Sequence, residues 1–425
     1  LPKNWGNLSW AELRKFQIEF SEVHCVWQGK TDDNGFLLCG FNGMSIDMAK
    51  YLKEKNLAGC VIVLGPKEPP MEYYQNLISV VSNTSTEEPT AKILDFDNDG
   101  NGYGPKVIDC DDTATFIKNE IEICDEVIVQ GPPGTGKTYM MANIINQLLN
   151  ASKSVLVTAL TNRALIELAN KETLDIHRSN KDVMKTNVSS DEMCLCKNIV
   201  SLDIASIKGK LTLTTFYTAS AWAKNSIANQ PPFDYVIMDE SSQALFAMIA
   251  ACKRLGKKTI WIGDQNQLPP IISLSEETMV RNNYGMLSNG FNTLCDKFRY
   301  PYYLLTKTYR LLPNSAALTS IFYKEPLVPM NLESKYDSKL EYIDKKGGTC
   351  LRLLSMPIGE KAYLDNYQYV IGIVSEILSE NPKASIAILS KFRSSVRQEP
   401  DHRWQTDESK TGGWYPLCIF ESQKL

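Results

Sequence analysis

Residues 131–138 have the types and spacing that bind phosphate. They read GPPGTGKT, which matches the P-loop pattern G-x-x-x-x-G-K-[ST] in full. Its glycines allow backbone N–H groups to turn toward phosphate oxygens at the positive end of a helix dipole. We expect Lys137 to reach the β- and γ-phosphates and the Thr138 hydroxyl to reach Mg²⁺. The sequence therefore predicts a site for a nucleoside triphosphate.

Two adjacent carboxylates downstream complete this predicted site. An apolar run at residues 235–238 ends in Asp239 and Glu240. We expect Asp239 to hold the water shell of Mg²⁺ and Glu240 to orient and deprotonate the attacking water. A lone Asp-Glu pair is usually a solvated turn, but the strand before it and the P-loop upstream favour hydrolysis.

Alternating strand and helix patterns must position these residues. Apolar runs at 126–130, 154–159, 211–216 and 259–262 are typical of buried strands, and residues 139–149 and 162–169 have helical periodicity. This alternation predicts a parallel sheet with ligand loops at the carboxyl ends of its strands. A helix ending at Asn381-Pro382 and a strand at 385–389 indicate a second α/β unit without a P-loop.

Composition excludes some classes of protein. The 425 residues are 43% hydrophobic with a net charge of −4, which fits two to four globular domains and argues against a histone-like wrapping protein. The eleven cysteines are scattered, as in reduced cytosolic proteins. We predict no membrane span and no signal peptide, and therefore a cytoplasmic protein without a membrane partner, or a nuclear one in a eukaryote.

Five segments together resemble superfamily 1 helicases. They are GPPGTGKT (131–138), VTALTNRALIEL (157–168), IMDESSQA (237–244), GDQNQLPP (263–270) and LTKTYRLLP (305–313). Their order and spacing are similar to those of the superfamily 1B branch that contains the nonsense-mediated-decay helicase and its DNA-replication relatives. The resemblance implies an ATP-dependent helicase or translocase that moves on single-stranded DNA or RNA and uses ATP and Mg²⁺.

The resemblance also implies a role for each matching residue. Catalysis would fall to Lys137, Asp239, Glu240, Gln267 and Arg310. Gln267 would contact the γ-phosphate, and Arg310 would stabilise the transferred phosphoryl group from the second domain. The nucleotide would contact Gly131, Pro132, Pro133, Gly134, Thr135, Gly136, Lys137 and Thr138, and Tyr309 would pack on adenine. Thr138 and Asp239 would hold Mg²⁺.

The nucleic-acid strand is expected at a second set of residues. By the same resemblance, its backbone would lie along Thr158, Thr161, Asn162, Thr214 and Thr215. Small polar side chains suit phosphate contacts that do not read sequence. The first three could equally cap a helix, which is compatible with strand contact.

One feature of these helicases is missing from the sequence. They place an adenine-reading glutamine before the P-loop, whereas residues 108–112 read IDCDD. A carboxylate such as Asp112 can accept a hydrogen bond from the exocyclic amine of adenine, so we expect Asp112 to substitute.

The predicted fold is α/β, with two recA-like parallel-sheet domains and an N-terminal accessory domain. We expect the accessory domain at 1–105, recA-like domain 1 at 106–298 with an insertion at about 171–210, and recA-like domain 2 at 299–425. This second domain is expected to be incomplete, because the sixth helicase motif is not in the sequence. A nuclease or effector domain could be fused or associated.

Two alternatives to a helicase stay open at this stage. The first is an ATPase stimulated by nucleic acid that remodels or senses complexes without unwinding. The second is an interaction protein whose partner affinity is switched by ATP.

Overall fold

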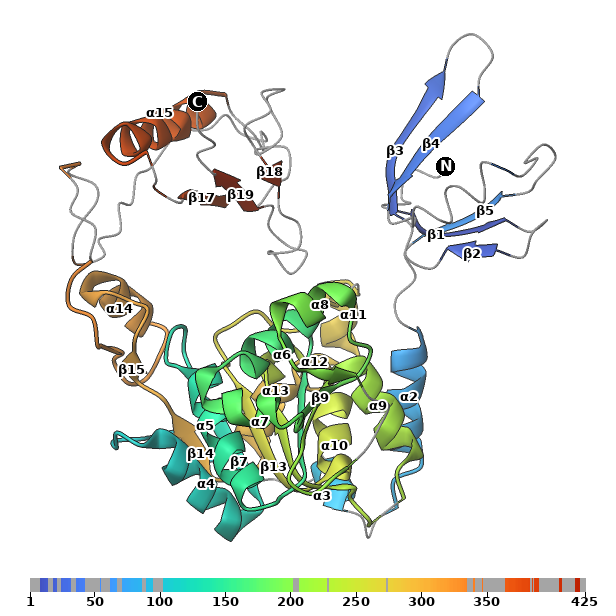
Figure 1. The fold of residues 1–425 in the computed structure, drawn as a ribbon, viewed down its shortest axis with the longest axis vertical. Coiled ribbons are helices and arrows are strands. Elements are labelled where there is room, and N and C mark those ends of the chain that lie inside the picture. Colours follow the sequence, from blue (N-terminus) through green and yellow to red (C-terminus); the bar gives the residue numbers. More distant parts are fainter. Residues whose placement is uncertain are drawn as a thin grey trace.

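The computed structural model describes residues 71–85, 89–94, 102–201, 206–227, 229–272 and 274–334, together with part of helix α15 (Leu364–Glu380) (Figure 1). Elsewhere it gives the backbone of short strands. Near the N-terminus these are β1 (Leu8–Leu13), β2 (Ile18–Phe20), β3 (His24–Thr31), β4 (Phe36–Asn42) and β5 (Ile62–Pro66). Near the C-terminus they are β17 (Ile386–Leu389), β18 (Gln405–Thr406) and β19 (Leu417–Phe420).

A nine-stranded sheet forms the centre of the described region. Its strands, in spatial order, are β10 (Val200–Ser201), β9 (Val183–Lys185), β11 (Leu211–Thr215), β8 (Val155–Ala159), β12 (Phe233–Met238), β13 (Gly256–Gly263), β7 (Glu126–Gln130), β14 (Tyr302–Leu304) and β6 (Lys106–Val107). Every neighbouring pair is parallel. The predicted α/β class, the parallel sheet and the strands around the P-loop are confirmed.

Helices cover both faces of this sheet, because its central strands are apolar on both sides. One hydrophobic layer contains side chains of α4 (Thr113–Cys124), α5 (Lys137–Asn150) and α6 (Asn162–Ala169). The other contains side chains of α9 (Phe216–Asn225), α10 (Phe246–Leu255) and α13 (Gly290–Lys297). Successive strand residues alternate between the layers: Val127 and Val129 face the first, and Ile128 faces the second.

The sheet domain extends beyond the predicted limits of 106–298. Helices α2 (Met71–Ser82) and α3 (Pro89–Leu94) bury Leu77, Val80 and Ile93 in the second layer, although the accessory domain was predicted to reach residue 105. Strand β14 pairs with β7, although the second domain was predicted to begin at 299. Both differences arise from packing against residues distant in the sequence, which local patterns do not reveal.

The predicted insertion at about 171–210 is also part of the sheet domain. Its strands β9 and β10 extend the sheet beyond β11 in parallel register. Leu174 and Val183 are fully buried in the first hydrophobic layer. The segment lacks a clear pattern in the sequence because its elements are short.

The remaining elements lie toward the two ends of the chain. Strands β1, β2 and β5 form one antiparallel sheet, and β3 pairs with β4. Helix α15 confirms the predicted helix ending before Asn381, and β17 confirms the strand after it. Strand β19 pairs antiparallel with β17 and β18. Most of 335–425 lies outside the described residues, so the second recA-like domain stays a prediction. Within the part that is described, no helix has the length and apolar character needed to cross a bilayer.

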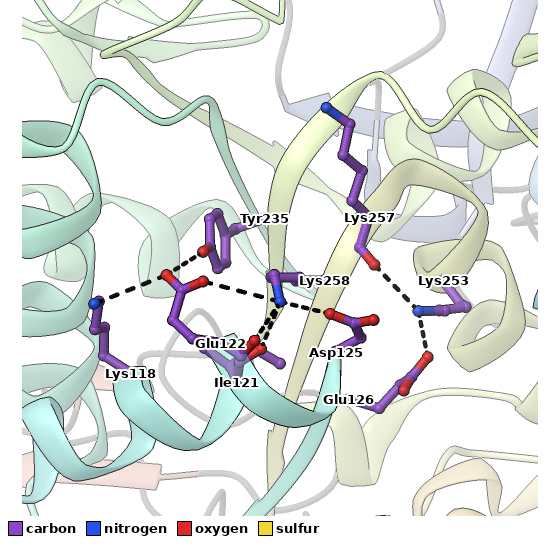
Figure 2. Close-up of polar contacts among 9 residues, drawn as sticks. All are labelled: Lys118, Ile121, Glu122, Asp125, Glu126, Tyr235, Lys253, Lys257 and Lys258. Carbon is purple, nitrogen blue, oxygen red and sulfur yellow. Dashed lines mark hydrogen bonds and ion pairs between the residues drawn. The ribbon is translucent and has the colours of Figure 1, made fainter.

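Lys258, at the edge where the strands begin, ties the sheet to α4 (Figure 2). Helix α4 ends at Asp125, whose φ of 60° is left-handed. The Lys258 Nζ donates to the carbonyls of Ile121 and Glu122, each at 3.0 Å, and pairs with the Asp125 carboxylate at 2.5 Å. A cation is favourable at a helix C-terminus, where carbonyl groups lack partners. Lys258 therefore stabilises the end of α4.

We expect Lys258→Met to lower the free energy of unfolding by about 1–2 kcal/mol, because the helix loses its cation and hydrogen bonds while the aliphatic stem stays. Urea denaturation measures the change. Lys257→Met is the matched control: its side chain is 63% exposed and pairs with Asp234, so a loss of about 0–1 kcal/mol is expected. Equal losses in both variants would show that helix capping by Lys258 adds nothing.

Candidate functional site

The P-loop connects β7 to α5, as predicted. Gly134 and Gly136 have left-handed φ angles of 76° and 79°, a conformation that glycine adopts without steric cost. The loop is also tightly packed, because a Cβ on Gly134 would collide with the Cβ of Arg310 and lie 2.9 Å from the Thr308 hydroxyl oxygen. Glycine at 134 is therefore required both by the turn and by its neighbours.

Lys137, at the start of α5, folds back under this loop. Its Nζ donates to the Gly131 carbonyl and lies 3.5 Å from the Pro132 carbonyl oxygen. Burial lowers the pKa of Lys137, while the carboxylates of Asp239 and Asp264 act in the opposite direction. The amine is thus bonded to carbonyl groups that a phosphate could replace.

Asp239 follows β12 and is 9% exposed. Its Oδ1 accepts a hydrogen bond from the Glu240 N–H at 2.8 Å. Burial raises the pKa of this carboxyl, and Lys137 opposes the rise. A carboxylate that is costly to bury is typical of a site that receives a cation.

Glu240 has a left-handed φ of 53°, which is uncommon outside glycine and clusters at functional sites. Its Oε2 is buried, and no hydrogen bond reaches that atom within the described part of the chain. Burial and the neighbouring Asp239 raise the pKa of Glu240 to about 7, against the N–H groups of Leu160 and Thr161. A pKa near the working pH suits a general base.

This pKa predicts the pH dependence of hydrolysis. A base with a raised pKa is protonated below about 7, so kcat/KM for Mg·ATP should rise as pH increases through 7 and then level off. Initial rates at limiting ATP, with nucleotide affinity measured at each pH as the control, check this. A flat profile across that window would contradict the assignment of Glu240 as the base.

Gln267 lies in the exposed loop after β13. Its backbone N–H donates to the Asp264 carbonyl at 3.0 Å, and its Nε2 donates to the Asp264 carboxylate at 3.2 Å. The Gly131 N–H of the P-loop donates to the Gly263 carbonyl at 2.9 Å, so this loop begins beside the P-loop.

Residues 308–310 lie directly on the P-loop. Tyr309 donates its backbone N–H to the Gly134 carbonyl at 2.8 Å, and the Thr308 hydroxyl donates to the Pro133 carbonyl at 3.2 Å. Arg310 contributes to the lowered pKa of Lys137, and its side chain is exposed. The structure therefore brings the predicted arginine and tyrosine to the P-loop from a segment far along the chain.

A cavity of about 430 Å³ lies beside the P-loop, which is large enough for a nucleobase and its ribose. Tyr309, Tyr139 and Asn143 line it together with Asp111 and Asp112. Tyr309 lies in the wall of this cavity, and its packing on the base stays a prediction.

The predicted role of Asp112 as the adenine reader meets a competing role. Its Oδ1 accepts from the Thr115 N–H at 3.0 Å and thereby caps α4. Hydrogen bonding to the Thr115 side chain, and then to its N–H, lowers the pKa of the Asp112 carboxyl. One carboxylate oxygen of Asp112 is therefore already engaged in capping α4.

Two of the predicted nucleic-acid residues are buried. The side chains of Thr158 and Thr214 are 0% exposed, and the Thr214 hydroxyl is 2.9 Å from that of Thr186. They lie on neighbouring central strands, where helices cover both faces. The prediction of direct strand contact is wrong for these two residues in this conformation.

The other three predicted residues lie at the carboxyl edge of the sheet. Thr161 and Asn162 are exposed, and Thr215 is half-buried at the end of β11. The Thr161 hydroxyl accepts from the Ala164 N–H at 3.2 Å, so it caps α6 as the alternative interpretation expected. The Thr161 backbone N–H also forms a hydrogen bond with Glu240 that lowers the pKa of that carboxyl. This edge of the sheet therefore lies beside the proposed base.

Comparisons with known proteins find similarity over part of the chain. Residues 119–273 match the family of AAA domains. The chain is 31% identical over 222 residues to the DNA replication ATP-dependent helicase/nuclease DNA2 of Saccharomyces cerevisiae. Over these residues the chain is therefore similar to ATP-dependent DNA replication helicase/nucleases.

The extent of this relationship is limited. The alignment with the yeast helicase/nuclease covers 49% of this chain and 14% of that protein. The JHS1 helicase/nuclease of Arabidopsis thaliana is 28% identical over 44% of this chain and 14% of its own length. The crystal structure of arterivirus nonstructural protein 10, a helicase, aligns at 12% identity over 79% of this chain and 59% of that one. Its TM-score of 0.34 is too low to support an argument.

Two residues of this site could not be predicted from the sequence. Asp264 stands inside the segment GDQNQLPP, but no pattern shows that it is fully buried and bonded to Gln267. Tyr323 has no local signal, because its hydroxyl reaches Asp264 across 59 positions of sequence. Only the folded chain brings these two side chains together.

Proposed function

We propose that this chain is the ATP-hydrolysing core of a helicase or translocase that moves along single-stranded nucleic acid. The observation that carries the proposal is the contact of residues 308–310 with the P-loop. It brings Arg310 to the loop that also holds Lys137, close to Asp239 and Glu240. A phosphate-binding loop, two carboxylates and an arginine from a later segment are the parts that phosphoryl transfer uses.

Phosphate binding would use the P-loop backbone and two positively charged side chains, those of Lys137 and Arg310. On binding, Lys137 would exchange its carbonyl partners for the β- and γ-phosphates, and Arg310 would lie near the transferred group. Preorganised cations stabilise the negative charge that develops on the phosphoryl oxygens. Tyr309 would pack on the base in the adjacent cavity.

The residues present fit Mg²⁺. Asp239 is buried with a raised pKa, and the buried Oε2 of Glu240 lacks a hydrogen bond within the described residues, so a cation would compensate both. The Thr138 hydroxyl and the Asp239 carboxylate would hold it. When bound, Mg²⁺ supplies positive charge that neutralises the phosphate oxygens.

Glu240 would act as the base toward the attacking water. Its Oε2 takes a proton from the water as the oxygen attacks the γ-phosphorus, and the ADP oxygen leaves. A carboxylate whose pKa lies near 7 can accept this proton and release it to solvent after each cycle.

Coupling to the strand would use the edge that adjoins Glu240. Thr161, Asn162 and Thr215 lie there, and Gln267 would sense the γ-phosphate. Closure of the second domain on ATP and reopening after hydrolysis would advance the protein along the strand. Because the relatives are named as DNA replication helicase/nucleases, single-stranded DNA is the first substrate to test, and an associated nuclease domain belongs to the proposal.

Strand displacement tests this function. A DNA duplex with a single-stranded tail and a fluorescent label is incubated with the full chain and Mg·ATP, and with a non-hydrolysable analogue as the control. Strand release that requires hydrolysis supports the helicase. DNA-stimulated hydrolysis without release would indicate the remodelling ATPase. A rate of hydrolysis that neither single-stranded DNA nor single-stranded RNA changes would exclude both.

A further inference from the structure

Asp264 is a fully buried carboxylate held by four hydrogen-bond donors. Its Oδ1 accepts from the Gln130 Nε2 at 3.3 Å and the Asn266 N–H at 3.2 Å. Its Oδ2 accepts from the Gln267 Nε2 at 3.2 Å and the Tyr323 hydroxyl at 2.7 Å. Among the described residues no lysine or arginine lies within ion-pair distance of Asp264. The buried charge therefore depends on these donors.

Tyr323 is the donor that comes from outside the sheet. It follows α14 (Pro313–Ser320), and burial together with the bond to Asp264 raises its pKa well above the ordinary value. The hydroxyl consequently stays protonated and keeps donating. The neighbouring Phe322 carbonyl accepts from the Asn266 side chain at 2.7 Å. Two contacts thus tie residues 322–323 to the loop that carries Gln267.

The same segment reaches the P-loop at its other end. Strands β15 (Lys307–Thr308) and β16 (Val328–Pro329) pair in parallel on either side of α14. At the start of this unit, Tyr309 donates to the Gly134 carbonyl. One compact strand–helix–strand unit therefore contacts both the P-loop, beside Arg310, and the Gln267 loop, through Tyr323.

We propose that Tyr323 is a positioning residue that allows Gln267 to leave Asp264 and turn toward the γ-phosphate. Gln267 and Tyr323 both donate to the Asp264 Oδ2. This buried oxygen therefore keeps the tyrosine as a partner when the Gln267 amide moves away. Without the tyrosine hydroxyl, that movement would strip Oδ2 of its last donor, and an unpaired buried anion is costly. Gln267 would then stay on Asp264. This inference rests on the proposed hydrolysis of ATP at the site.

The test is Tyr323→Phe in the full chain, which keeps the ring and removes only the hydroxyl. We expect kcat for DNA-stimulated ATP hydrolysis to fall about tenfold, while the dissociation constant of a fluorescent ATP analogue stays within about twofold. A loss in kcat without a loss in affinity indicates an interaction needed after binding.

Tyr235→Phe is the matched control. The Tyr235 hydroxyl also donates to a carboxylate, Glu122, at 2.5 Å, but at the opposite edge of the sheet (Figure 2). Both variants lose a tyrosine–carboxylate bond and are expected to lose similar stability, but only Tyr323→Phe should lose turnover. Equal activity losses would overturn the proposal, and so would full activity of Tyr323→Phe.

An Asp264→Asn background gives a second readout. The amide removes the buried charge, so removing the Tyr323 hydroxyl should cost much less there than in the parent chain. If Tyr323→Phe lowered kcat by the same factor in both backgrounds, the role of Oδ2 would be overturned. If the parent chain itself fails to hydrolyse ATP, the proposed function fails; if the parent is active and Tyr323→Phe equals it, only this inference fails.

Discussion

Lys137→Ala is expected to abolish nucleotide binding and to reduce ATP hydrolysis by at least roughly 10²–10³-fold. The amine is held beneath the P-loop by backbone carbonyl groups, so its charge is available to phosphate. Alanine removes that charge from a partly enclosed site, where electrostatic interactions are stronger than in water. Binding of a fluorescent ATP analogue and steady-state phosphate release measure the two effects.

Lys224→Ala is the control for Lys137→Ala, because this exposed lysine lies in the last turn of α9, far along the chain from the P-loop. It should bind and hydrolyse ATP like the parent. Thermal unfolding of Lys137→Ala should stay close to that of the parent, which separates a lost site from a lost fold. Parent-level hydrolysis by Lys137→Ala would refute the P-loop assignment.

Glu240→Gln is expected to retain ATP binding and stop hydrolysis. The amide keeps the shape of the side chain but cannot take a proton from water. Burst and steady-state phosphate release, beside nucleotide binding, separate the two steps. Glu277→Gln, at an exposed position of α11 (Glu276–Arg281), is the control. If Glu240→Gln hydrolysed ATP at the parent rate, the base would have to be another group.

The same substitution should stabilise the fold above neutral pH. The folded-state pKa of Glu240 is raised from 4.5 to about 7, so the folded chain binds the proton more tightly than the unfolded chain does. The charged carboxylate therefore destabilises the fold increasingly as pH rises from 4.5 to 7, and fully above that. Glu240→Gln should raise the Tm at pH 8 by a few degrees and leave it nearly unchanged at pH 4.5. A carboxylate that is needed for activity is expected to lower the stability of the folded protein in this way.

The catalytic half of the site was predictable because its chemistry imposes local patterns. A loop that wraps phosphate needs glycines at fixed positions, and Gly134 and Gly136 take the left-handed conformation that the pattern implies. Strands β7 and β12 deliver the P-loop and Asp239 as predicted. The contact of Arg310 with the P-loop was expected from the resemblance alone.

The remaining features depend on packing between distant segments. Thr158 and Thr214 have the polar side chains expected at a nucleic-acid edge, but their places on central strands bury them. Helix α2 belongs to the sheet domain through contacts with α9, which no periodicity within α2 indicates. Tyr323 reaches Asp264 because of how α14 folds back, and the sequence contains no sign of this.

We propose that the P-loop, the two carboxylates and Arg310 form one ATPase that a nucleic-acid strand activates. Phosphate release by the full chain, measured at saturating Mg·ATP while single-stranded DNA is titrated, tests it most directly. We expect a rate of phosphate release that rises with DNA to a plateau and that falls to near zero in Arg310→Ala. A rate independent of DNA, or one unaffected by loss of Arg310, would contradict it.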